Sequence, residues 1–161
     1  MTREMRRKRQ ALSAEECEQV LRQGNHGVLA LHGDDGYPYA VPLNYVYADG
    51  RIYFHSARQG HKLDAIARDG KASFCVVAND DLVPSEFTTY FKSVIAFGRM
   101  RVVDDGSERM ASLTALTERL APSEPAASMQ AEVDRCALRD IVVMLALDPE
   151  RITGKQAKEL V

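Results

Sequence analysis

The segment IYFHSARQGHKLDAIA, residues 52–67, has the pattern of a short apolar strand, a polar turn and an amphipathic helix. The expected helix begins at Gly60-His61-Lys62, where the first N–H groups have no partner inside the helix. These N–H groups and the positive end of the helix dipole favour a bound phosphate or carboxylate. Lys62 adds a full positive charge at the same place. The segment therefore predicts an anion-binding turn around which the rest of the chain is arranged.

Several side chains of this turn can donate hydrogen bonds to an anion. Ser56, Arg58 and His61 lie in the turn or at the start of the helix, and His55 precedes them on the expected strand. The same residues also fit a second interpretation, in which the segment is only scaffold. In that case the apolar side of the helix packs inward and the basic side chains are solvated, because the turn lacks the fixed spacing of a P-loop.

The preceding segment YPYAVPLNYVY, residues 37–47, alternates between two faces, with all four tyrosines, Val41 and Leu43 on one of them. Proline cannot donate to the hydrogen-bond ladder of a central strand. Pro42 in the middle of this segment therefore predicts a sheet edge, a bulge or a split in the sheet. Such an edge either leaves backbone groups to a ligand or serves only to block pairing with another chain.

Other strand-like segments occupy residues 26–33, 51–56, 71–79, 93–104 and 140–155, and Asp-Gly turns join some of them. About six strands at short spacing predict a mainly β (α+β) fold, an antiparallel barrel or sandwich with peripheral helices. Gly98 interrupts its strand as a bulge would. The segment from Asp80 to Tyr90 follows neither period, and we expect it to form a long loop.

Three or four helices are expected between these strands. Ser13 and Glu16 have the spacing of a capping box, and Gly24 ends the helix that follows them. Apolar residues recur at helical spacing between residues 110 and 120 and again between 129 and 136. We expect a single domain over residues 1–161, with a basic arm at 1–12 and a loosely ordered tail at 156–161.

The composition excludes several classes of protein. With 45% hydrophobic and 27% charged residues and a net charge of −2, the chain has an ordinary globular composition and little attraction for nucleic acid or anionic membranes. No apolar run approaches the roughly 20 residues that span a bilayer, and no signal peptide is evident, so a cytoplasmic location is expected. The 3 scattered cysteines predict buried free thiols, and the 4 histidines lack metal-site spacing, so no metal is expected.

The order and spacing of these segments resemble one known family. The chain resembles the NimA-like nitroimidazole-resistance proteins, which belong to the pyridoxamine 5'-phosphate oxidase-like FMN-binding split barrels. The blocks that carry this resemblance are GVLALHGDDGYPYAVPLNYVYADGRIYFHSARQGHKLDAI (27–66), KASFCVV (71–77), FTTYFKSVIAFGRMRVV (87–103) and ERITGK (150–155).

The resemblance implies a six-stranded antiparallel split β-barrel that forms a homodimer, with FMN as cofactor at the subunit interface. It implies that residues 41–44 lie along the flavin ring and that the segment from His55 to Lys62 holds the phosphate. It further implies that residues 90–94 come from the partner subunit and cover the ring. It also implies that His55 takes part in the substrate chemistry. The cofactor-binding residues are then Val41, Pro42, Leu43, Asn44, His55, Ser56, Ala57, His61, Lys62, Tyr90, Phe91 and Val94.

These features predict an FMN-dependent oxidoreductase that reduces a small organic substrate, with nitroimidazoles and other nitroaromatics as candidates. His55 is the first candidate for a proton donor, although a strand histidine that only packs or hydrogen-bonds is equally compatible; Tyr45, Tyr47 and Tyr90 are weaker candidates. Alternatives are a flavin-binding or redox-sensing protein with little turnover, a haem-binding split barrel, and a deazaflavin protein. No C-terminal Arg/His pattern for a substrate phosphate is present, which argues against pyridoxamine phosphate oxidation, and the absence of a dinucleotide fingerprint leaves the electron donor open.

Overall fold

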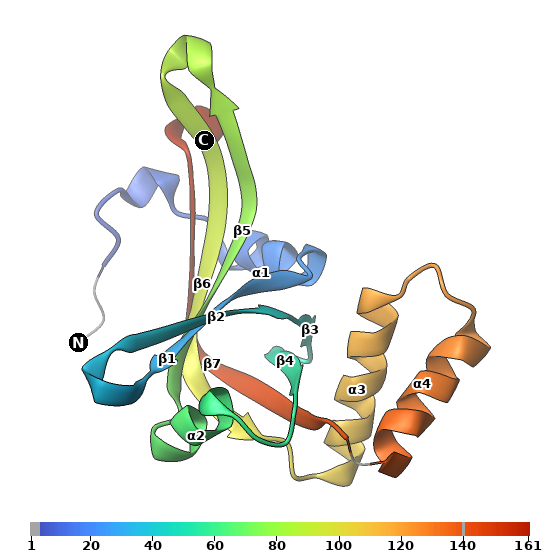
Figure 1. Ribbon diagram of the computed structural model, residues 1–161. Helices are drawn as coiled ribbons and strands as arrows, with labels where there is room; N and C mark the ends of the chain where they lie inside the picture. Colours follow the sequence, from blue (N-terminus) through green and yellow to red (C-terminus); the bar gives the residue numbers. More distant parts are fainter. Residues whose placement is uncertain (1–3, 140) are drawn as a thin grey trace.

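The computed structural model describes residues 4–139 and 141–161; residues 1–3 of the basic arm, and Asp140, which the sequence places in the last strand, lie outside the described residues. The strands are β1 (His26–His32), β2 (Pro38–Asn44), β3 (Val46–Ala48), β4 (Arg51–Ser56), β5 (Lys71–Val83), β6 (Thr88–Val102) and β7 (Val143–Gln156). They form one 7-stranded antiparallel sheet in the order β2-β1-β5-β6-β7-β4-β3, which curls around a common core (Figure 1).

The sheet is split between two strands that are neighbours in sequence. β2 pairs with β1 as far as Asn44, and β3 pairs with β4 from Val46 onward, so the chain crosses from one edge of the sheet to the other at Tyr45. The two edge strands are therefore joined there by one residue of covalent chain, and no ladder of hydrogen bonds closes the barrel. The predicted split barrel is confirmed, with seven strands instead of six because residues 37–47 form two strands.

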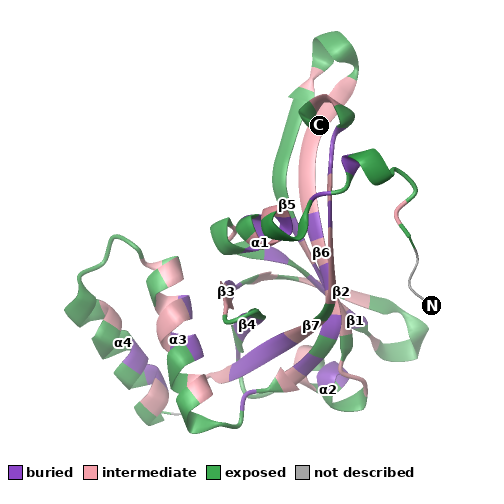
Figure 2. Ribbon diagram, turned by 180° about the vertical axis from the view of Figure 1, so that it is seen from behind, coloured by how far each residue is buried: buried purple, intermediate pink, exposed green. Residues whose placement is uncertain are grey.

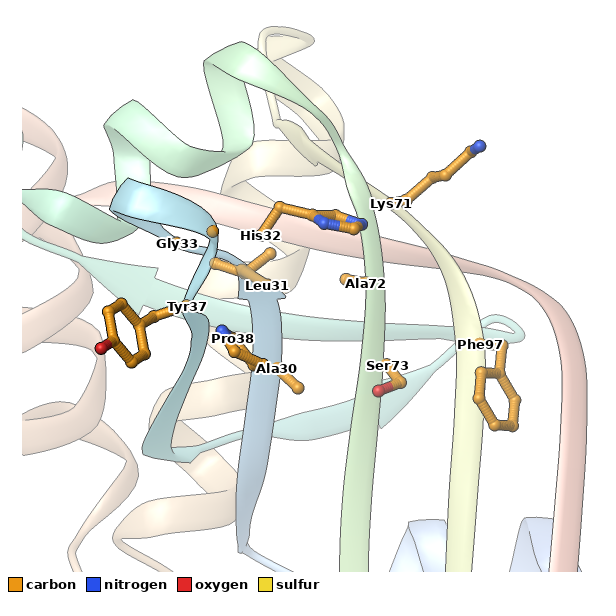
Figure 3. Close-up of a pocket in the computed structure, with 11 residues that line it drawn as sticks. Ala30, Leu31, His32, Gly33, Tyr37, Pro38, Lys71, Ala72, Ser73 and Phe97 are labelled. Atoms are coloured by element: carbon orange, nitrogen blue, oxygen red, sulfur yellow. The ribbon is translucent and has the colours of Figure 1, made fainter.

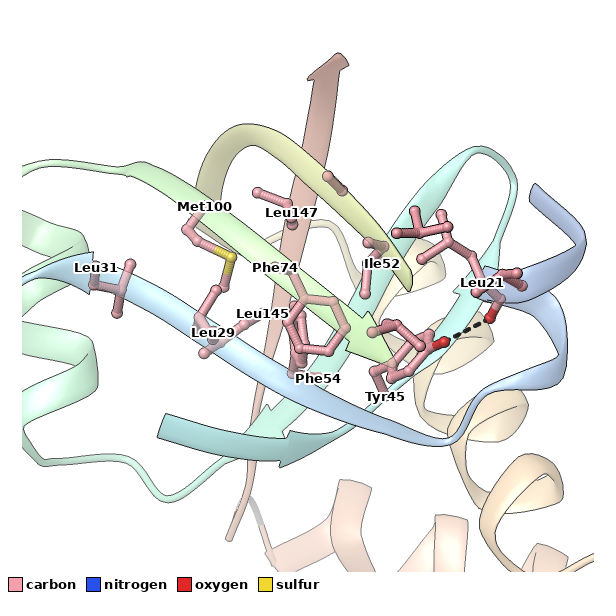
Figure 4. Packing of buried hydrophobic residues seen from close by; sticks show 14 of the residues in the cluster. Leu21, Leu29, Leu31, Tyr45, Ile52, Phe54, Phe74, Met100, Leu145 and Leu147 are labelled. Atoms are coloured by element: carbon pink, nitrogen blue, oxygen red, sulfur yellow. Dashed lines mark hydrogen bonds between the residues drawn. The ribbon is translucent and has the colours of Figure 1, made fainter. Parts of the chain in front are cut away.

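The inner face of the curled sheet encloses one apolar core (Figure 4). Tyr45, Phe54 and Phe74 are fully buried in it, and the ring of Phe74 meets the other two rings edge to face, with centroids 5.0 Å apart in both pairs. The hydroxyl of Tyr45 donates a hydrogen bond to the carbonyl oxygen of Leu21 at 2.8 Å. Burial raises the pKa of Tyr45, and its hydroxyl proton is held by the Leu21 carbonyl, so its place in the structure is that of a core anchor.

The helices are α1 (Ala14–Gln23), α2 (His61–Arg68), α3 (Gly106–Leu120) and α4 (Ala126–Arg139). Ser13 and Glu16 form the predicted capping box at the start of α1, and Gly24 follows its last residue. The helices expected in the 110–120 and 129–136 regions are confirmed as α3 and α4, which form a hairpin beside β3, β4 and β7 (Figure 1). Over residues 4–139 and 141–161, no helix is both long and apolar enough to cross a membrane.

A second apolar cluster lies between the α3–α4 hairpin and the outer face of the sheet, and it includes Tyr53, Leu113 and Met144. A charged cluster fixes the start of α3 beside it. Arg101 contacts Glu108 at 2.7 Å and Asp148 at 2.7 Å, and Glu108 also accepts a hydrogen bond from the Tyr53 hydroxyl at 2.9 Å. The Arg101 guanidinium lowers the pKa of Glu108, so the network is charged near neutral pH.

The expected loop at residues 80–90 is instead the outer part of a β-hairpin. β5 continues to Val83, a 3₁₀ turn spans Pro84–Glu86, and β6 begins at Thr88. The hairpin projects beyond the barrel, and its outer part is largely exposed (Figures 1 and 2). Apolar alternation is absent there because neither face packs on a core, whereas backbone pairing such as Asp80 with Phe91 still holds the two strands together.

Gly98 lies at a register shift between β6 and β7, as predicted for a bulge. The expectation of a loose tail at residues 156–161 is wrong at its start. Gln156 is the last residue of β7, and Ala157 is buried with its N–H donating to the carbonyl oxygen of Phe91 at 2.8 Å. A short 3₁₀ turn, Lys158–Leu160, follows. The start of the tail is ordered by this contact with β6. The outer part of β6 lies in the projecting hairpin, which hydrophobic periodicity does not identify as strand.

We expect Tyr45→Phe to lower the free energy of unfolding by about 1–3 kcal/mol, because the buried carbonyl of Leu21 loses its donor. Urea denaturation of the variant and the parent chain measures this difference. Tyr37→Phe is the matched control, because Tyr37 is 76% exposed. Equal stability of the Tyr45→Phe variant and the parent would show that the hydrogen bond makes no net contribution.

Candidate functional site

The strand–turn–helix predicted around residues 52–67 is present between β4 and α2. β4 ends at Ser56, α2 begins at His61, and Gly60 occupies the N-cap position. Gly60 has a φ of 135°, a conformation that residues with a Cβ rarely adopt. Because glycine has no side chain, none caps the first N–H groups of α2. These N–H groups are available to an anion.

Lys62 supplies a cation in the first turn of α2. Its side chain is partly buried, and this burial lowers the pKa of its ammonium group. In the part of the chain that the structure describes, no carboxylate forms an ion pair with Lys62. Burial of an uncompensated charge is costly, and an anionic ligand would offset that cost.

His61 is held at the surface by two neighbours. Its ring stacks on Tyr39 of β2 at a centroid distance of 4.1 Å, and its Nε2 lies 3.4 Å from a carboxylate oxygen of Asp34. Asp34 also pairs with Arg68 of α2 at 2.5 Å. The contact through Nε2 leaves Nδ1 as the ring nitrogen that could face a ligand in the turn. The stack also fixes the start of α2 to the edge strand β2.

The structure places residues 41–44 on β2, at one edge of the sheet, so the edge predicted from Pro42 is confirmed. Val41 and Leu43 pack against the core, whereas Pro42 and Asn44 are exposed. β2 and β4 approach each other across the split. The backbone of residues 41–44 and the turn after β4 therefore border the same open edge.

The single chain does not bring Tyr90 and Phe91 to this edge, because they belong to the part of β6 that forms the projecting hairpin (Figure 1). Tyr90 donates a hydrogen bond to Glu86 at 2.9 Å, and Phe91 lies under the ammonium group of Lys155 at 4.9 Å from the ring centroid. Val94 is 0% exposed in the core of its own barrel. Alternation along β6 turns its side chain inward, so only its backbone is left to border a cofactor.

His55 is on the outer face of β4 and lines a cavity of about 380 Å³ between the end of β4 and the α3–α4 hairpin. The other walls of this cavity are mainly aliphatic and come from α3, α4 and the segment after α4. Desolvation of the ring on the cavity side lowers the pKa of His55, and the positive charge of Lys62 lowers it further. His55 therefore borders both the cationic turn and the apolar cavity.

The cavity itself was not predicted from the sequence. The apolar residues that recur at helical spacing in α3 form one stripe, in which Leu113 and Leu116 are buried. Leu120 belongs to the same stripe, but it is 40% exposed and lines the cavity. The sequence shows only that the apolar stripe continues to Leu120, and how much of it the sheet covers depends on the tertiary structure.

A separate pocket of about 350 Å³ lies on the outer face of β1, β2 and β5 (Figure 3). Small side chains such as Ala30, Ala72 and Ser73 leave space beside Phe97 of β6. None of the residues predicted to bind the cofactor lines this pocket. It belongs to a sheet face that is partly exposed in the single chain.

The family model described as pyridoxamine 5'-phosphate oxidase matches residues 13–156. The chain belongs to this family. The match of the pyridoxamine 5'-phosphate oxidase family begins at the N-cap of α1 and ends with the last residue of β7, so it includes both β2 and the turn before α2. No curated protein matches the chain.

Solved structures share the split-barrel fold. A putative 5-nitroimidazole antibiotic resistance protein from Bacteroides thetaiotaomicron VPI-5482 has a TM-score of 0.74 and 19% identity over 91% of this chain and 86% of that chain. An FAD-binding protein from Mesorhizobium loti has a TM-score of 0.68 and 28% identity over 92% and 97%. An FAD and haem binding protein from Mycobacterium smegmatis has a TM-score of 0.72 and 22% identity over 92% and 73%.

We expect the imidazole of His55 to titrate below its ordinary pKa of about 6.5, since the cavity desolvates it and Lys62 is nearby. The pKa should rise in Lys62→Gln, which removes the charge, and stay close to the parent value in Lys62→Arg, which keeps it. NMR titration of the histidine ring signals measures these values. If Lys62→Gln left the His55 pKa unchanged, the two side chains would not interact.

Proposed function

We propose that the chain is an FMN-dependent oxidoreductase that reduces a small organic substrate, with nitroaromatic compounds as a candidate class. The observation that carries this proposal is the uncapped start of α2, where partly buried Lys62 has no carboxylate partner in the described chain, beside the open edge of β2. A terminal phosphate fits this donor set because it accepts hydrogen bonds from backbone N–H groups and pairs with Lys62.

In this proposal Lys62, His61 and the first N–H groups of α2 hold the phosphate, and Ser56 and Ala57 contribute from the end of β4. The backbone of residues 41–44 lies along the ring, where edge strand β2 leaves donors and acceptors unpaired by another strand. When bound, the flavin supplies the electron-transfer chemistry that amino-acid side chains lack. The relative from Mesorhizobium loti, described as FAD-binding, adds support for a flavin in this fold.

His55 is the residue that we assign to proton transfer. It lies between the phosphate turn and the apolar cavity, so a substrate in the cavity could receive a proton from a nitrogen of its imidazole. The lowered pKa makes the neutral ring the main form at pH 7. The protonated ring, which is the stronger acid, becomes more populated as the pH falls, so proton donation from it becomes more frequent in acid.

We further propose that the active form is a homodimer, because the hairpin segment with Tyr90 and Phe91 does not reach the site of its own chain. The outer face of the sheet supplies a surface for the second copy. Val28, Cys75, Ile95 and Thr153 are in register across β1, β5, β6 and β7. This row remains partly exposed in the single chain. Its Cys75 is a free thiol that is only partly buried, whereas the sequence predicts buried thiols.

We expect Lys62→Ala to weaken FMN binding by about 1.5–3 kcal/mol, the scale of a charge-assisted hydrogen bond, or roughly 10- to 150-fold in Kd. Titration of the flavin-free protein with FMN, followed by flavin fluorescence, gives the two affinities. Lys71→Ala is the control, because Lys71 begins β5 and is exposed away from the turn. Identical affinities in Lys62→Ala and the parent would show that the phosphate does not bind at this turn.

We expect His55→Gln to lower the turnover number by about 100-fold or more if the imidazole is the proton donor, with little change in FMN affinity. Steady-state oxidation of a reduced nicotinamide with a nitroaromatic acceptor provides the assay. A parent protein that binds FMN but shows no turnover with nitroaromatic or other small acceptors would contradict the proposed oxidoreductase activity. The alternative of a flavin-binding or redox-sensing protein would then be favoured.

We expect Val28→Glu to shift the protein from dimer to monomer in analytical ultracentrifugation and to weaken FMN binding, because a charge would be buried in the interface. Leu138→Glu is the matched control, since Leu138 is 86% exposed on α4. A parent protein that sediments as a monomer would contradict the interfacial site.

The absorbance spectrum of the purified protein, with the released chromophore identified by mass, tests the cofactor directly. FMN is the expected chromophore. Released FAD would leave the anion-binding role of the turn unchanged, but it would replace FMN as the assigned cofactor. A Soret band would instead favour the haem-binding alternative, in which a histidine such as His55 could be an axial ligand.

A further inference from the structure

The outer face of β4 is covered along only part of its length. Tyr53 and His55 both point to this face. Tyr53 is 4% exposed, and its hydroxyl is bonded to Glu108 of α3. His55 is two residues further along β4, beyond the covered part, and it lines the cavity between the strand and the α3–α4 hairpin. The α3–α4 hairpin therefore leaves space beside His55, which also borders the anion-binding turn.

The walls of this cavity are mostly apolar. Leu113, Leu116 and Leu120 project from α3, and Ile141 and Val142 close the cavity from the segment before β7. Leu120 is 40% exposed and Ile141 is 41% exposed, so large apolar side chains remain uncovered in this region. The volume of about 380 Å³ falls in the range of roughly 300–1,000 Å³ that is common for small-molecule sites.

The charged groups of the cavity neutralise each other. Glu132 and Arg135, both on α4, form an ion pair at 2.5 Å. The same carboxylate accepts a contact from the Cys136 sulfur at 3.4 Å. The pair gives the cavity little net charge, and the remaining polar groups are the His55 imidazole and the Thr117 hydroxyl, whose Oγ1 donates to the Leu113 carbonyl at 2.8 Å. A charged ligand would lose its hydration without gaining a counter-ion.

We propose that this cavity is the substrate pocket, and that it takes a neutral, largely apolar small molecule whose single polar group faces His55. The proposal rests on the proposed function, because that function places the phosphate end of the cofactor in the turn beside the same histidine and assigns proton transfer to that histidine. The aliphatic walls select the apolar body of the molecule, and the imidazole selects and orients its polar end. The α3–α4 hairpin is thus the specificity-determining wall of the site.

Benzyl alcohol and benzoate are the probes, one neutral and one anionic with the same ring. We expect benzyl alcohol to bind the FMN-saturated protein, detected by saturation-transfer NMR, and benzoate to bind at least tenfold more weakly. Leu120→Trp and Ile141→Trp, which fill the cavity from two sides, should each weaken benzyl alcohol binding at least tenfold. Leu138→Trp, on the exposed side of α4, should leave it unchanged.

The FMN affinities of all variants are measured in parallel, and the alcohol titration is repeated without FMN. Loss of probe binding with unchanged FMN affinity supports the pocket whether or not the protein turns over a substrate. Failure to bind FMN, with probe binding still sensitive to the two filling variants, contradicts the proposed function alone. Probe binding that is absent or that ignores both filling variants overturns the pocket. A changed sedimentation coefficient in those variants, with the probe affinity unaltered, also overturns the pocket and would show that the cavity is a contact between chains.

Discussion

The architecture depends on how Tyr45 is held at the split of the barrel. Its ring packs edge to face on Phe74, and its hydroxyl satisfies the carbonyl of Leu21 at the end of α1. Because Tyr45 belongs to neither flanking strand, β2 and β3 can pair at opposite edges of one sheet. The open edge of β2, which borders the candidate cofactor site, exists only because this residue joins the two edges while buried in the core.

Two contrasting environments meet at the end of β4. On one side, the uncapped start of α2 and Lys62 form a cationic turn that is suited to an anion. On the other side, α3 and α4 enclose an apolar cavity whose two charged groups neutralise each other. His55 borders both, and both lower its pKa, the cavity through desolvation and Lys62 through its charge. An anchoring turn beside an apolar pocket is the arrangement that the proposed flavin-dependent reduction needs.

Sequence patterns succeeded where the chain packs against its own core and failed where it does not. The edge at Pro42, the Gly98 bulge and the buried run at Met144–Leu147 were all predictable, because each reflects a local backbone or burial constraint. The outer β5–β6 hairpin was missed because its exposed residues show no period. Val94 was assigned to a cofactor contact by resemblance, although alternation along β6 buries it.

The sequence by itself determined the class of fold, the positions of most strands and the strand–turn–helix with Lys62, because periodicity, turn residues and a glycine N-cap act over a few neighbouring residues. Only the tertiary structure decided that β2 borders β4, that His61 stacks on Tyr39, and that α3 and α4 leave a cavity beside His55. These features join segments far apart in the chain. They depend on how the sheet curls and how far a helix pair can cover it, which no local pattern records.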